Sequence, residues 1–160
     1  MRLRKFYSIL TFLLFAAFVN CHAQSSTNVA SIMNEIVKKY DNCEGVNCMS
    51  VVKGGGLEMI KMTLKNEFGK DFMKGVTSIT IIEYSDASEE LCVTLHKDLD
   101  AFLSILQEHD VSKEKQFSDN DYIRCFSSTS DSGVLSDFVI ALENDDSKML
   151  MYMAGKIEVE

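Results

Sequence analysis

The sequence contains no proline and no tryptophan, and only three of its 160 residues are arginines. The absence of proline excludes proline-rich linkers and recognition segments, and the absence of tryptophan removes the aromatic side chain most often used to stack on sugars. Clustered positive charge is also absent beyond residue 23, where 24 acidic residues stand against 13 basic ones and no lysine or arginine cluster occurs. Nucleic acids and anionic membranes would meet a repulsive field, so we expect neither as a partner.

The N-terminus has the pattern of a secretory signal. A run over residues 6–19, apolar except for Ser8 and Thr11, follows three basic residues (Arg2, Arg4 and Lys5), and small residues precede a cleavage point after Ala23. The run is shorter than the roughly 20 residues of a membrane-spanning helix. We therefore expect residues 1–23 to be a removed signal peptide and residues 24–160 to be a single domain, periplasmic or secreted, with no transmembrane span.

An alternative for this segment is a lipoprotein signal, in which Cys21 would be acylated and would anchor the domain to a membrane. Asn20 stands where such signals usually have glycine, alanine or serine, and Phe18 is a poor match for the usual leucine. Free export is therefore the preferred interpretation. Removal of residues 1–23 leaves 13 basic and 24 acidic residues, so the exported domain would have a strongly acidic surface.

Four cysteines remain beyond the signal segment, and an oxidising compartment favours disulfides among them: Cys43, Cys48, Cys92 and Cys125. The first two flank a turn-like segment, so their Cα atoms could approach to the roughly 4.4–6.8 Å that a bridge requires. We name Cys43 and Cys48 as a candidate disulfide, and two unpaired thiols are the alternative. A zinc site is disfavoured, because the usual C-x2-C spacing and a following histidine pair are missing.

The apolar periodicity alternates between helical and extended segments. Apolar residues spaced three and four apart predict helices over 29–40 and 57–68. A third helix is predicted to begin at a capping box formed by Asp86 and Glu89 and to end at about His109. Segments rich in β-branched residues, or alternating in polarity, predict strands over 46–52, 76–84, 122–127, 134–143 and 148–154, the last extending as far as Val159. Turn-rich connectors between the last three strands indicate an antiparallel meander.

This order predicts an α+β domain with a single, mainly antiparallel sheet of about five strands and three helices on one face. An antiparallel sheet can leave its other face in water. Asp137 and Arg124 each interrupt an otherwise apolar strand, which is consistent with a half-exposed sheet.

Several short segments resemble the small exported bacterial proteins of domain-of-unknown-function family 4252. The matching features are Lys39-Tyr40 followed by Glu44-Gly45-Val46, the strand Val76–Ile82 after Lys74-Gly75, and the C-terminal segment Ala154–Glu158. The resemblance covers nearly all of the exported chain and implies its fold and its export. It brings no catalytic residue, and the cysteine pair Cys43 and Cys48 departs from the family pattern.

Cys92 and His96 are four residues apart on the longest predicted helix, as a nucleophile and its base, or two metal ligands, would be. The stronger interpretation is packing. Cys92 falls within the apolar stripe of Leu91, Leu95 and Leu99, where a small buried thiol fits, and His96 lies at its rim.

Met149, Met151 and Met153 alternate along a predicted strand, so their thioethers would line one face in a row. Such soft ligands suit copper(I). Packing is again preferred, because neighbouring side chains on one strand face are roughly 6.5–7 Å apart and methionine readily fills gaps under a helix.

No assembled catalytic, cofactor or metal motif is present, so we expect no enzyme, no cofactor and no resident metal. The leading hypothesis is an exported envelope protein that binds a protein or another envelope component through an open sheet face or an edge strand. One alternative is an envelope enzyme or copper-handling protein that uses Cys92, His96 or the methionine row. Another is an envelope sensor linked to a regulator, and the oligomeric state is left open.

Overall fold

The computed structural model describes residues 29–68, 70–109, 122–129 and 134–157. The predicted signal peptide over residues 1–23, with Cys21, lies outside these ranges, as does most of the charged segment before residue 122. Cleavage, export and lipid attachment therefore stay predictions. None of the described helices is long and apolar enough to cross a membrane.

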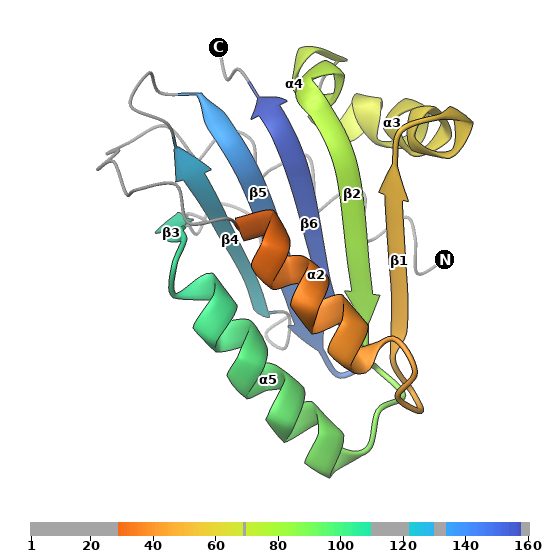
Figure 1. The fold of residues 1–160 in the computed structure, drawn as a ribbon, viewed down its shortest axis with the longest axis vertical. Coiled ribbons are helices and arrows are strands. Elements are labelled where there is room, and N and C mark those ends of the chain that lie inside the picture. The colour runs from red at the N-terminus through yellow and green to blue at the C-terminus, as the bar shows by residue number, and fades with distance from the viewer. Residues whose placement is uncertain (1–28, 69, 110–121, 130–133, 158–160) are drawn as a thin grey trace.

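The described chain forms one six-stranded sheet in which every neighbouring pair is antiparallel, in the order β1-β2-β6-β5-β4-β3 (Figure 1). The α+β class, the single antiparallel sheet and the β4-β5-β6 meander are confirmed; the sixth strand, β3, was not predicted. In chain order the elements are α2 (Val29–Tyr40), β1 (Asn47–Val52), α3 (Gly55–Phe68), α4 (Lys70–Gly75), β2 (Val76–Glu83), α5 (Glu89–Leu103), β3 (Gln107–His109), β4 (Tyr122–Thr129), β5 (Leu135–Asn144) and β6 (Ser147–Ile157).

Helices α2 and α5 cover one face of the sheet (Figure 1). Their apolar residues recur every three or four positions, which gives each helix one buried stripe. The largest fully buried side chains on this face come from both helices and from the strands beneath them: Met33, Tyr40, Leu95, Phe102, Ile82, Phe126 and Leu150. At the end of α2, Lys39 Nζ and Tyr40 Oη donate to Asp98 Oδ2 over 2.6 and 2.7 Å, which ties α2 to α5.

Helices α3 and α4 belong to the opposite face, so the prediction of three helices on one face is wrong. Leu57 of α3 and Met73 of α4 pack in one buried cluster with Ile79 of β2, whereas Ile82 packs with α2 and α5. Odd- and even-numbered residues of a strand point to opposite faces, so the two clusters lie on opposite sides of the sheet. Helical periodicity marks a buried stripe but not the sheet face that it meets.

The centre of this second face is buried as well, which corrects the expectation of a half-exposed sheet. Cys125, Ile140 and Met151 follow one another across three neighbouring strands and all belong to the buried cluster. Arg124 and Asp137, which suggested a wet face, instead lie on the α2–α5 side. The Arg124 guanidinium stacks 4.7 Å from the centre of the Phe126 ring.

The boundaries of α5 also differ from the prediction. The helix is capped by Ser88, whose hydroxyl accepts a hydrogen bond of 3.3 Å from the Leu91 amide, and not by Asp86. It ends at Leu103, because residues 107–109 pair with β4 as strand β3. Long-range strand pairing thus overrides the local periodicity.

Strand β6 passes very close to the junction of α4 and β2. Gly155 has φ +152°, and a Cβ atom at this position would lie 2.1 Å from the Gly75 carbonyl oxygen. Only glycine fits without movement of one backbone or the other. The strand register shifts at the same place, between Val76 and Ser78.

Candidate functional site

Cys92 and His96 lie on α5, and their polar groups have different neighbours. The buried Cys92 thiol contacts the carbonyl oxygens of Tyr84 and Ala87 at 3.9 and 3.7 Å, and Lys148 Nζ at 3.9 Å. His96 Nε2 lies 3.5 Å from Glu143 Oε1, but the geometry is not that of a hydrogen bond. The structure therefore does not join Cys92 and His96 as a nucleophile and its base.

His96 borders a small pocket of about 190 Å³ between α5 and the strands. Its apolar lining includes Leu99, Leu103 and Leu150, while Tyr84, Asp100, Arg124 and Glu143 supply polar atoms. Burial raises the pKa of the Tyr84 hydroxyl far above its ordinary value, so this group stays neutral at physiological pH.

The arginine in the lining of this pocket is already paired with carboxylates. Arg124 donates through Nε to Glu108 over 2.8 Å and lies 3.5 Å from Asp100 Oδ1. A pocket of this size also falls below the roughly 300–1,000 Å³ typical of small-molecule sites. The arrangement supports packing of α5 on the sheet better than it supports a ligand.

Cys125 lies in the cluster on the opposite side of the sheet from Cys92. Burial raises the pKa of its thiol to about 12 from the ordinary value of 9.0, so the sulfur carries its proton at neutral pH. The fold therefore does not gather Cys92, His96 and Cys125 into one cleft.

The methionine row of β6 is placed as its alternation predicts, with the three side chains on one strand face. Met151 and Met153 are buried in the cluster with Phe138 and Ile140, and Met149 is half-buried. Their sulfur atoms thus have the surroundings of core side chains. Copper(I) binding at this row stays a prediction without a supporting contact in the described residues.

Cys43 and Cys48 are free thiols in the structure and both pack against the α2–α5 cluster. Cys43 Sγ contacts the Lys39 carbonyl oxygen at 3.7 Å. Burial, with smaller contributions from Asp41 and Cys43, raises the pKa of Cys48 to about 11. The bridge between these two cysteines therefore stays a prediction.

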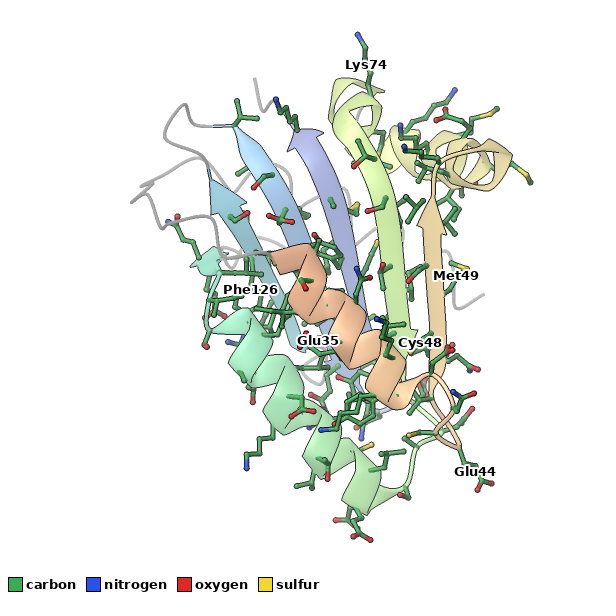
Figure 2. The ribbon with its side chains drawn as sticks, in the orientation of Figure 1. Glu35, Glu44, Cys48, Met49, Lys74 and Phe126 are labelled. Atoms are coloured by element: carbon green, nitrogen blue, oxygen red, sulfur yellow. The ribbon has the colours of Figure 1, made fainter. Side chains whose placement is uncertain are left out.

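One edge of the sheet carries exposed apolar side chains that no local sequence pattern indicates. Met49 and Val52 of β1 are 44% and 63% exposed, and Met59 and Met62 of α3 are 72% and 64% exposed. Helix α3 lies beside the end of β1 at the margin of the molecule (Figure 1), and Figure 2 shows Met49 on the side of the molecule away from α5. We call these four side chains, with the side of β1 that pairs with no strand in the described part of the chain, the β1 edge surface.

The two edges of the sheet are built differently. Strand β3 is three residues long and carries Glu108, paired with Arg124, so it offers little to a further strand. Strand β1 pairs with β2 over six consecutive residues without a register shift and contains no charged residue and no proline. A strand without charges is the sequence feature that could have indicated a pairing surface, but only the strand order shows that β1 forms an edge.

No family model, no curated protein and no solved structure matches this chain. Similarity therefore assigns it neither a family nor an activity, and membership of domain-of-unknown-function family 4252 stays a prediction.

Proposed function

We propose that this protein is an exported binding module of the cell envelope that takes up an extended segment of another polypeptide along β1. The observation that carries the proposal is the β1 edge, to which no other described strand pairs, in a sheet whose other edge is short and charged. An edge strand has unpaired N–H and C=O groups, and a second extended chain satisfies them by adding a strand.

The exposed side chains next to this edge add apolar contact to the backbone hydrogen bonds. Met59 and Met62 are three residues apart on α3 and therefore neighbours on the helix surface. Unbranched thioether side chains adapt to partners of differing shape. Val93 of α5 is also exposed, but it stands alone on its helix, and single exposed apolar residues are ordinary.

A chemical role has less support, because the structure separates the residues that it would need. The thiols of Cys92 and Cys125 lie on opposite sides of the sheet. Among the described residues, no group of three histidine, cysteine or acidic side chains is placed to hold a metal ion. Export itself depends on residues 1–23, whose sequence pattern supports the envelope location.

The test is photo-crosslinking in native envelopes from a reactive residue introduced at Val52, with and without Met49→Lys. A lysine on an edge strand discourages further strand pairing, so the substitution should suppress the crosslink. Val93→Lys is the matched control, since Val93 is 67% exposed and lies on α5, away from the edge. The proposal would be refuted by equal crosslinking with and without Met49→Lys. It would also be refuted if the reactive residue at position 52, without any other substitution, gave no crosslink.

A further inference from the structure

We infer that the polypeptide taken up by the β1 edge surface is a second copy of this chain, paired antiparallel about a two-fold axis near Ser50. The inference rests on the proposed function and names its partner. A two-fold interface uses the same surface on both copies, so that surface must be complementary to itself. Strand β1 meets this requirement in its side chains, its hydroxyl groups and the charges at its ends.

The side-chain pattern of β1 favours one register. Paired residues in an antiparallel ladder point to the same face. With the axis at Ser50, each Ser50 faces its counterpart, Met49 faces Val51, and Cys48 faces Val52, so every apolar residue meets an apolar one. An axis at Met49 would instead set Asn47 against Val51 and leave the exposed Val52 outside the pairing.

A row of hydroxyl groups would continue across the interface in this register. Within one copy, Ser50 Oγ and Thr80 Oγ1 are 3.1 Å apart and hydrogen-bonded on neighbouring strands. Thr80 is buried and Ser50 is exposed at the edge. Pairing of the two Ser50 residues would give a Thr80–Ser50–Ser50–Thr80 row, and cross-strand hydroxyl pairs of this kind stabilise sheets.

The charges at the two ends of β1 are opposite in sign. Glu44 precedes the strand, Glu83 faces its first residue, Asn47, and Lys53 follows its last residue. Figure 2 places Glu44 at the end of the sheet opposite Lys74. Antiparallel pairing sets Lys53 of one copy beside Asn47 of the second. Lys53 then lies two strand spacings, or ~10 Å, from Glu83 of the second copy, which has the opposite charge. Parallel pairing would instead bring like charges together.

Helix α3 would enlarge this interface beyond the two strands. A two-fold axis perpendicular to the sheet keeps corresponding faces on the same side, so both α3 helices lie on the face that carries Met49 and Val51. In antiparallel pairing, the end of each β1 lies beside the start of the second copy's β1. Helix α3 follows the end of β1 in the chain, so it begins close to the second copy. The helices that carry the exposed Met59 and Met62 would thus lie near the junction of the two copies.

Light scattering on the purified full chain, with its signal segment removed, tests this arrangement directly. We expect a mass of two chains for the wild type and for the Val93→Lys control, and a shift toward one chain for Met49→Lys. Val52→Lys is a second edge variant, and far-ultraviolet circular dichroism confirms that each variant is folded. A wild-type mass of one chain, or a dimer that both edge variants leave intact, would overturn the inference.

The register is tested with Ser50→Cys in a Cys43→Ala, Cys48→Ala background. Mild oxidation should link two copies through position 50, whereas Val93→Cys in the same background should stay unlinked. Failure of the link in a dimeric protein would exclude this register. If the purified chain is monomeric while the edge-dependent crosslink in envelopes joins it to a different polypeptide, the second copy is excluded and the binding function stands. If neither a dimer nor a crosslink forms, both the second copy as partner and the proposed binding function are refuted.

Discussion

The buried thiol of Cys125 should make the stability of this protein fall at alkaline pH. The pKa of the thiol is about 12 in the folded chain, against 9.0 ordinarily, because the side chain is desolvated in the cluster on the α3 side of the sheet. Above pH 9 the unfolded chain releases this proton while the folded chain keeps it. The stabilisation is therefore complete below the ordinary pKa and is lost as the pH rises toward the folded value.

The size of the effect follows from the two pKa values. Each pH unit in this window removes about 1.4 kcal/mol, so raising the pH from about 8 to about 10.5 should remove about 2 kcal/mol through Cys125. Tyr84 and Tyr152 also have raised pKa values, mainly through burial, and add to the loss above the ordinary tyrosine pKa of 10.0. A comparison with Cys125→Ala isolates the thiol, because the tyrosines are present in both proteins.

The assay is urea unfolding at a series of pH values with a reductant present, for the wild type and for Cys125→Ala. The variant should be less stable at about pH 8, because the substitution removes the buried sulfur atom and leaves a small cavity in the core. Its stability should then fall with pH by about 2 kcal/mol less than that of the wild type. Parallel pH curves would mean that the Cys125 thiol is not held in the core, and the assignment of this sheet face as buried would be wrong.

Three further perturbations test the packing that positions the β1 edge. Gly155→Ala should cost about 3 kcal/mol or prevent folding, because its Cβ would lie 2.1 Å from the Gly75 oxygen; a wild-type urea midpoint would contradict this close approach. Met33→Ala, at a fully buried position on the inner face of α2, should cost about 2–5 kcal/mol, and a loss within error would place α2 off the sheet. Hydrogen bonds from Lys39 and Tyr40 lower the pKa of Asp98 below 3.8, so this carboxylate stabilises the fold above its ordinary pKa and ceases to do so as the pH falls. Asp98→Asn should therefore flatten the acid side of the stability profile, and an unchanged acid side would argue against the tie between α2 and α5.

The elements that the sequence predicted well are those with strong local patterns. Residues 29–40 and 76–84 were placed within a residue or two of α2 and β2, because a single apolar stripe and a run of β-branched side chains each favour one conformation. Prediction was weaker where local and long-range preferences compete. Residues 107–109 continue the helical periodicity of α5, yet they pair with β4.

The candidate site was only partly accessible from the sequence. An edge strand was expected as a contact surface, but nothing local identifies which strand lies at an edge. Cys92 and His96 were correctly placed on one helix, and their spacing could not show that the thiol meets the carbonyl of Tyr84 while the imidazole meets Glu143. Side-chain direction within a helix face depends on what packs against it.

The sequence by itself determined the α+β class, the order of the main helices and strands, and the buried stripes of α2 and α5, because backbone periodicity and side-chain polarity act over a few residues. Only the tertiary structure decided that β6 lies between β2 and β5, that α3 packs opposite α5, and that β1 forms an edge of the sheet among the described strands. These outcomes depend on the free energy of contacts between distant segments, since an apolar stripe specifies burial without specifying its partner.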